Sequence, residues 1–95
     1  MKISEVRVNE KANIEGRVLE VFDEKVIVKK SGEQTSVKEF LIDDGNASIL
    51  LALWGDDIST ANLGVDDEVI VDGYVTEYKG VKKISKGKYG KITKK

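Results

Sequence analysis

The chain has 95 residues, a formal net charge of −1, and neither cysteine nor histidine. A chain of this length makes one domain around a single core, and we treat residues 1–95 as that domain. Without cysteine and histidine the chain has no disulfide, no thiolate nucleophile and no imidazole base or metal ligand, which argues against an enzyme and against a resident cofactor. No apolar run approaches the roughly 18 residues of a membrane span, and the first residues lack a signal-peptide pattern, so we expect a cytoplasmic protein with no membrane partner.

The charge is unevenly distributed along the sequence. Residues 1–78 contain all 17 acidic residues and eight basic ones, whereas residues 79–95 contain eight lysines and no acidic residue. The body of the chain is therefore acidic, at −9, and its end is cationic, at +8. Such asymmetry can steer a polyanion to one side of a molecule. For the last few residues, the alternative to a role in attracting a polyanion is that the lysines only keep the end of the chain soluble. We expect residues 93–95 to fray.

The first half of the chain predicts strands after a lead-in over residues 1–11. Residues 12–22 alternate between apolar and polar, and the parity changes near Gly16, which indicates a bulge that lets one long strand bend and serve two sheets. Residues 26–28 extend or follow that strand, and residues 29–36 are typical of an exposed loop.

The next two strands are predicted to pair through a tight turn. Residues 37–43 alternate with Phe40 and Ile42 facing the core. The turn Asp43-Asp44-Gly45-Asn46 supplies residues that tolerate left-handed backbone, and it leads antiparallel into a strand that ends at Trp54.

Residues 56–65 are too polar for a central strand and predict a short helix of about two turns. Asp56 or Asp57 can cap its beginning and Gly64 can end it. Ile58 and Leu63 are among its expected buried positions.

The remaining sequence predicts two more strands and completes the fold. A strand over residues 68–78 is followed by a tight turn at Lys79-Gly80. A last strand starts at Val81, is interrupted, and resumes at Ile92. Five bent antiparallel strands with a short helix between the third and fourth are typical of an OB-fold, a five-stranded Greek-key barrel. The predicted class is therefore mainly all-β, with the barrel over residues 12–92.

Three aromatic residues fall on the outward parity of these strands. Period-two alternation places Trp54 opposite the core side of its strand, and it does the same for Tyr74 and Tyr78. Flat aromatic surface outside the core is what stacked nucleobases use. Two structural alternatives stay open: Trp54 could tuck under a loop as a core residue, and the tyrosines could merely cover the barrel.

Lysines near these aromatics are candidate phosphate contacts. They lie around the loop that follows the first strand and in the turn after Tyr78: Lys30, Lys38, Lys79, Lys82 and Lys83. Paired aspartates at 43–44, 56–57 and 66–67 could suggest a metal or acid–base site. Their positions beside turns favour caps and solvated loops, so no metal site is predicted.

An ordered set of sequence segments resembles one known family. The segments are residues 13–18, 43–46, 49–55, 63–69 and 73–80, the last reading Gly-Tyr-Val-Thr-Glu-Tyr-Lys-Gly. Together they are similar to the OB domains of archaeal single-stranded DNA-binding proteins and of replication protein A. The resemblance covers about residues 3–92.

The resemblance implies a function for the outward aromatics. In that family a tryptophan on the third strand and two aromatics on the fourth stack on successive bases, and Trp54, Tyr74 and Tyr78 match those positions. It therefore implies sequence-tolerant binding of single-stranded DNA in replication or repair, with lysines on the phosphates. Other OB domains or replication and repair proteins are further possible partners.

Two other functions remain open from the sequence. One is an RNA-binding OB-fold, which would differ by contacts to the 2′-hydroxyl. The other is a protein-interaction module of a replication or repair assembly, which would be favoured if Leu50, Ala52 and Trp54 formed an exposed apolar patch.

Overall fold

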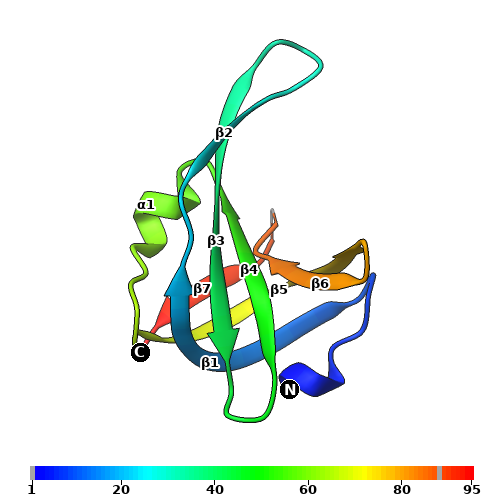
Figure 1. Ribbon diagram of the computed structural model, residues 1–95, viewed down its shortest axis with the longest axis vertical. Coiled ribbons are helices and arrows are strands. Elements are labelled where there is room, and N and C mark those ends of the chain that lie inside the picture. The colour runs from blue at the N-terminus through cyan, green and yellow to red at the C-terminus, as the bar shows by residue number, and fades with distance from the viewer. Residues whose placement is uncertain (1, 88) are drawn as a thin grey trace.

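A computed structural model describes residues 2–87 and 89–95, which form one sheet rolled into a barrel (Figure 1). The strands of this described part are β1 (Lys11–Val21), β2 (Lys25–Val28), β3 (Gln34–Asp43), β4 (Ser48–Trp54), β5 (Glu68–Tyr78), β6 (Val81–Ser85) and β7 (Lys91–Lys94). The ring order is β1-β3-β4-β6-β5, and it closes because β1 also pairs with β5. A 3-10 helix, η1 (Ile3–Glu5), precedes the barrel, and α1 (Asp57–Ala61) lies between β4 and β5. The predicted OB-fold is confirmed.

The long strand β1 bends so that it can pair with two neighbours. Its first part pairs with β5 and its last part with β3, and the register shifts between Val18 and Glu20. The expected bulge therefore falls at Leu19 and not beside Gly16. Gly16 has a different role, because a Cβ there would lie 2.6 Å from the carbonyl oxygen of Asp43. The residue lets β1 and β3 approach closely at the bend.

A two-stranded arm projects from the barrel, at the top of Figure 1. It consists of β2 and the first residues of β3, with Val26–Val28 paired to Gln34–Ser36. The loop expected over residues 29–36 is thus shorter, because residues 34–36 belong to a strand. All four residues of β2 are exposed, and Val26 and Val28 retain 65% and 63% of their accessible surface. Residues 26–28 follow the first strand as a strand of their own, as expected. Their pairing with residues 34–36 could not be predicted from short-range alternation, since neither face of the arm reaches the core.

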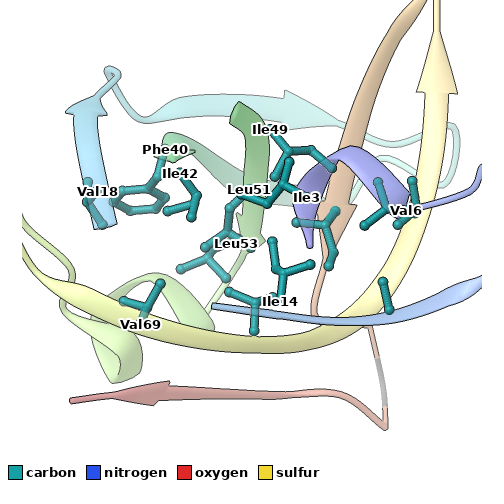
Figure 2. Close-up of a cluster of buried hydrophobic side chains, with 14 of the residues drawn as sticks. Ile3, Val6, Ile14, Val18, Phe40, Ile42, Ile49, Leu51, Leu53 and Val69 are labelled. Atoms are coloured by element: carbon teal, nitrogen blue, oxygen red, sulfur yellow. The ribbon is translucent and has the colours of Figure 1, made fainter. Parts of the chain in front are cut away.

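The core is made by the inward parity of the barrel strands. Figure 2 shows Phe40, Ile42, Leu51 and Leu53 packed together inside the ring. The fully buried set that fills the barrel, at less than 2% exposure, is Ile14, Val18, Phe40, Ile42, Leu51, Leu53, Val69, Val71, Val75 and Ile84. Burial of these side chains is the main favourable term in folding, at roughly 1.5–3 kcal/mol for each large aliphatic residue.

Two short helices cover the barrel on opposite sides (Figure 1). Ile3 of η1 is buried in the core cluster, and its backbone N–H donates to Asp44 Oδ2 at 2.9 Å. On the other side α1 has the predicted place in the chain, and the following Leu63 is buried. This helix ends at Asn62 in the left-handed conformation, two residues before the expected Gly64.

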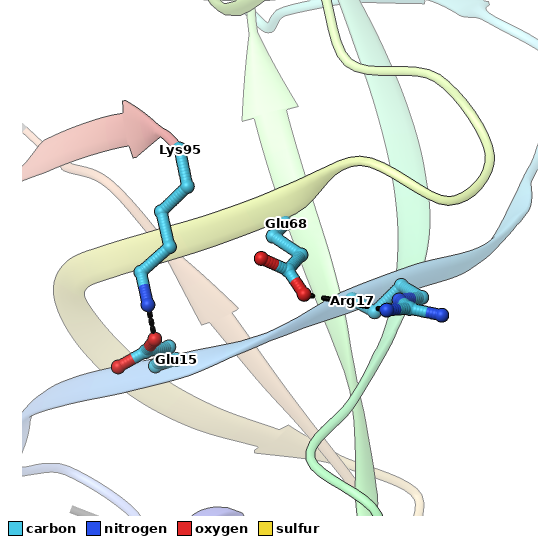
Figure 3. A network of polar contacts seen from close by, with 4 residues as sticks. All are labelled: Glu15, Arg17, Glu68 and Lys95. Carbon is cyan, nitrogen blue, oxygen red and sulfur yellow. Dashed lines mark hydrogen bonds and ion pairs between the residues drawn. The ribbon is translucent and has the colours of Figure 1, made fainter.

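The end of the chain is paired. β7 runs antiparallel to the first half of β5, and the backbone N–H of Lys95 donates to the carbonyl of Glu68 at 2.8 Å. Lys94 forms an ion pair with Asp67, and Lys95 forms one with Glu15 (Figure 3). Residues 93–95, expected to fray, thus lie in β7 or are hydrogen-bonded beside it. Within the described residues, no helix has the length and apolar character that a membrane crossing requires.

Candidate functional site

One outward surface of the barrel crosses β4, β6 and β5. In a sheet, directly paired residues share a face, so Ala52 on β4, Ser85 on β6 and Tyr74 on β5 form one row. Leu50, Lys83 and Thr76 form the next row, and Tyr78 lies beyond it opposite Val81. Trp54 follows Ala52 by two residues and so keeps its parity. We call this surface the outer face.

All three predicted aromatics are exposed on the outer face. Trp54 retains 45% of its accessible surface, Tyr74 42% and Tyr78 67%. Trp54 is paired with Val37 of β3, which is buried although it shares the outward parity, and we attribute this burial to the neighbouring indole. The structure therefore does not support a core position for Trp54.

Tyr74 is held in place from its far end. Its hydroxyl donates to the carbonyl oxygen of Asn9 at 2.8 Å, in the segment that leads into β1. Tyr74 is also the residue at which β5 pairs both with Lys11 of β1 and with Ser85 of β6. Its ring is thus oriented by a hydrogen bond and by paired strands on both sides.

A cation lies at the centre of the outer face. The Nζ of Lys83 is 2.5 Å from Oε2 of Glu39, and because β4 lies between β6 and β3, this ion pair passes over β4. Both side chains are partly buried, at 33% and 24% exposure. Beneath the pair, Leu50 is half-buried and Ala52 is buried. The apolar patch of Leu50, Ala52 and Trp54 that would favour a protein partner is thus absent, since of the three only Trp54 is exposed.

The other predicted lysines divide between the outer face and elsewhere. Lys79 joins the aromatics, with its Nζ 5.4 Å from the ring centre of Tyr78. Lys82 has the opposite parity, and its Nζ donates to the carbonyl oxygen of Val6 at 3.2 Å. Lys38 also has the inward parity, and its Nζ lies 5.8 Å from the ring centre of Phe40. Lys30 lies in the turn at the tip of the arm.

Two lysines that sequence reasoning missed extend the outer face. Lys25 of β2 is paired with Val37, which places it on the same side as Trp54. Lys11 of β1 is paired with Tyr74. Lys25 could be placed on the outer face only from the pairing register of the arm. Lys11 could be placed there only from the pairing of β1 with β5 that closes the barrel. Neither placement can be read from local alternation.

Among the described residues, a second surface is a groove that lies away from the aromatics. It measures about 840 Å³ and lies between β1, η1 and the turn from β3 to β4. Five of its lining residues are acidic and only two are basic: Glu5, Glu15, Asp43, Asp44 and Glu68 against Lys2 and Arg17. Figure 3 shows part of this surface, where Arg17 pairs with Glu68 and Glu15 with Lys95. Its charge disfavours a polyanion.

Two of the paired aspartates, Asp44 and Asp67, hold turns through backbone N–H groups, whereas Asp56 occupies the N-cap position of α1 without a side-chain capping bond. Asp44 accepts hydrogen bonds from the backbone N–H groups of Ala47, Ile3 and Asn46, which lowers its pKa to about 2. The pKa of Asp67 is also lowered, first by the backbone N–H of Gly64 and then by Lys94. Among residues 2–87 and 89–95 no three acidic side chains come together in a way that could hold a metal ion.

Comparison with known proteins gives matches in structure only. No family model matches the chain, and no curated protein is similar enough in sequence to match. The second OB-fold domain of replication protein A from Methanococcus maripaludis is 25% identical, with a TM-score of 0.82 over 99% of this chain and 92% of that one. A crystal structure of a domain of replication protein A from the same organism is also 25% identical, with a TM-score of 0.79 over 100% and 96% of the two chains.

A more distant structure has the same fold. The replication factor A related protein from Methanobacterium thermoautotrophicum is 14% identical, with a TM-score of 0.82 over 100% of this chain and 89% of that one. The resemblance stated from the sequence is thus confirmed at the level of structure: the chain is an OB-fold similar to domains of archaeal replication protein A.

Proposed function

We propose that this OB-fold binds single-stranded DNA without strong sequence preference, by stacking bases on Trp54, Tyr74 and Tyr78. The observation that carries the proposal is that these three exposed aromatics share the outer face and flank the lysine at its centre. The similarity to domains of replication protein A supports a nucleic-acid partner. The activity is binding, and the proposal includes no catalytic step.

The spacing of the aromatics suits an extended strand. Tyr74 and Tyr78 are four residues apart on β5, which corresponds to about 13 Å along a strand. Trp54 lies on β4, two strands away, which corresponds to roughly 10 Å across the sheet. Bases stacked at these three positions would follow a path across the barrel, and the path would pass over Lys83.

Charge around this path favours a polyanion although the whole chain is slightly acidic. Lys79 and Lys83 lie beside the aromatics, Lys25 lies beyond Trp54, and Lys11 is paired with Tyr74. Such lysines would neutralise phosphates and make the affinity depend on salt. The acidic groove on another part of the barrel would orient the molecule in the same sense.

The test is a titration of the protein with oligo-dT, followed by the fluorescence of Trp54, the only tryptophan. Quenching is expected, and the variants Trp54→Ala, Tyr74→Ala and Tyr78→Ala should each weaken binding about 5-fold to 150-fold by anisotropy of a labelled oligonucleotide. Val65→Ala, which truncates an exposed apolar residue in the connector before β5, is the matched control and should leave affinity unchanged.

Three comparisons decide the class of ligand. Weak binding of duplex DNA relative to oligo-dT supports the proposal, because paired bases offer no exposed face for stacking. A tighter response to RNA of the same length would replace it with the RNA-binding alternative. The absence of any response at micromolar protein would overturn it and leave a protein partner as the remaining hypothesis.

A further inference from the structure

A hollow of about 280 Å³ opens beside Tyr74, where the chain turns from β6 to β7. Tyr74 and Tyr89 supply aromatic surface to its lining. Lys11 and Lys86 supply basic side chains, and Asp72 supplies the one carboxylate among the described lining residues. Gly87 and Gly90 line the turn side. We call this hollow the Tyr74 pocket.

Glycine shapes this pocket. Gly87 has a positive φ of 64°, a backbone conformation that residues with a side chain rarely adopt. The space where a Cβ would be is open. At Gly90 a Cβ would collide with the carbonyl oxygens of Lys86 and Asp72, so the turn packs directly against β5. The hollow is therefore a consequence of how the backbone crosses β5 at this turn.

The size and lining of the pocket fit a nucleotide. Its volume lies just below the roughly 300–1,000 Å³ typical of sites for drug-sized ligands, which suits a smaller molecule. Phenol rings offer a surface for a base, and an ammonium group offers a partner for a phosphate. Lys86 is engaged elsewhere, with its Nζ 3.5 Å from Oδ1 of Asp57. Lys11, paired with Tyr74 across the strands, is the candidate for the phosphate.

The pocket is continuous with the outer face. Tyr74 belongs to both, and the row that contains it also contains Ser85, the residue just before Lys86 and the turn. β6 runs parallel to β4, with Ser85 opposite Ala52. The chain that follows Ser85 into the turn therefore extends in the same direction as the chain from Ala52 to Trp54. A strand stacked on Trp54 and Tyr74 would therefore pass the mouth of the pocket.

We propose that the Tyr74 pocket takes a single nucleotide of the bound strand, with its base against the phenol rings and its phosphate at Lys11. As a feature of strand binding the pocket rests on the proposed function. As a nucleotide site it can be tested alone.

The first experiment titrates the unaltered protein with AMP at millimolar concentration and follows the backbone amides by NMR. Shifts are expected at Gly87 and Gly90, whose N–H groups report on the pocket, and not at Gly45 in the turn from β3 to β4. Sodium phosphate at the same concentration is the control for simple anion binding. If phosphate alone reproduces the shifts, or if AMP moves no pocket amide, the pocket is not a nucleotide site.

The second experiment asks whether a strand uses the pocket. Lys11→Glu and Tyr89→Ala should each weaken binding of a labelled oligo-dT by about threefold to tenfold, while Trp54 is still quenched at saturation. Lys2→Glu makes the same charge change in the acidic groove and should have the smaller effect. No loss for Tyr89→Ala would overturn the use of the pocket by the strand, whatever the effect of Lys11→Glu, because Lys11 also lies on the outer face.

The two proposals fail differently. Pocket shifts with AMP but no quenching of Trp54 by any oligonucleotide would retain the nucleotide site and reject strand binding on the outer face. Quenching of Trp54 with no pocket shifts would retain strand binding and reject the pocket.

Discussion

Glu39 holds the ammonium of Lys83 over the middle of β4, in the path that we propose for the bases. A phosphate that approaches Lys83 has to compete with this carboxylate, which also repels it. An ion pair between partly exposed groups is worth only about 0.2–1 kcal/mol, so competition by a polyanion is feasible. Glu39 is therefore expected to weaken nucleic-acid binding without preventing it.

The substitution Glu39→Gln should accordingly strengthen binding of oligo-dT by about twofold to fivefold, because it frees the charge of Lys83 and removes a repulsion. Fluorescence anisotropy at fixed salt measures this change. Glu77→Gln changes the net charge by the same amount on the opposite parity of β5 and is the matched control. Equal gains from both variants would mean that only net charge matters and that the pair over β4 has no specific role.

Asp44 connects the beginning of the chain to the turn between β3 and β4 through three backbone N–H groups. These hydrogen bonds favour the charged carboxylate and lower its pKa from 3.8 in the unfolded chain to about 2 in the fold. A lowered folded-state pKa means that the stabilisation is complete above pH 3.8 and is lost as the pH falls through about 2.

Asp44→Asn should therefore lower the urea midpoint of unfolding at pH 6, and the difference from the parent protein should shrink as the pH falls from 4 to 2. Urea titrations at several pH values provide the measurement. Asp23→Asn, at an exposed position between β1 and β2, is the control and should leave the midpoint unchanged. A gap between Asp44→Asn and parent that stays constant down to pH 2 would contradict the assignment.

At the residue scale, the sequence predicted which side of the sheet a side chain faces better than it predicted which residues that side chain contacts. Alternation placed Trp54, Tyr74 and Tyr78 outside the core because parity depends only on the strand itself. The contacts of Lys82 with Val6 and of Lys83 with Glu39 depend on segments far apart in the chain. Adjacent lysines in a turn looked equivalent, but the register of β6 sends them to opposite sides.

At the scale of the elements, the bend of β1 is the feature on which barrel closure depends. Gly16 lies where β1 changes from β5 to β3, and a Cβ there would meet the Asp43 carbonyl oxygen at 2.6 Å and Ile42 Cγ2 at 2.8 Å. Neither atom can move aside easily, since the first is backbone and the second belongs to a fully buried side chain.

Gly16→Ala is thus expected to destabilise the fold by about 1–3 kcal/mol, the range for overpacking. Gly64→Ala is a suitable control, because its nearest neighbour would be Asp67 Oδ2 at 3.7 Å, an ordinary contact. Chemical unfolding of both variants measures the difference. Similar free energies of unfolding for the two would show that β1 and β3 adjust to the added methyl group.

The arm shows where element prediction stops. Core strands alternate because one face is buried, and β3 from Val37 onward and β4 were predicted on that basis. Residues 34–36 pair with β2 beyond the edge of the core, so no face is buried and the alternation carries no information. Likewise, β7 was recognised only at Ile92, because the lysines around it are typical of a solvated end.

At the scale of the whole molecule, the lysines of the outer face stand against an acidic groove. A strand bound on the outer face would contact Lys11, Lys25, Lys79 and Lys83, at the most four phosphates. For single strands the slope of log affinity against log salt is about −0.7 for each phosphate neutralised.

The expected slope for oligo-dT is therefore about −2 to −3, and Lys79→Gln should reduce its size by about 0.7. Lys91→Gln, on β7 away from β4 and β6, removes a charge of the same sign and is the comparison. Titrations at four or five salt concentrations give both slopes. A slope near zero would mean that the lysines make no phosphate contacts and that stacking alone holds the strand.

Tyr74 is shared between the proposed contact with a base and the closure of the barrel, because β1 and β6 both meet β5 at this residue. Trp54 is the last residue of β4, followed by a glycine and the connector, and it is paired with one strand only, at Val37 of β3. Natural variation and directed evolution should consequently tolerate substitutions at Trp54 more readily than at Tyr74, although both residues lie on the outer face. Under the proposed function, substitutions that alter base stacking can accumulate at Trp54, whereas a substitution at Tyr74 also removes a contact where β5 meets β1 and β6.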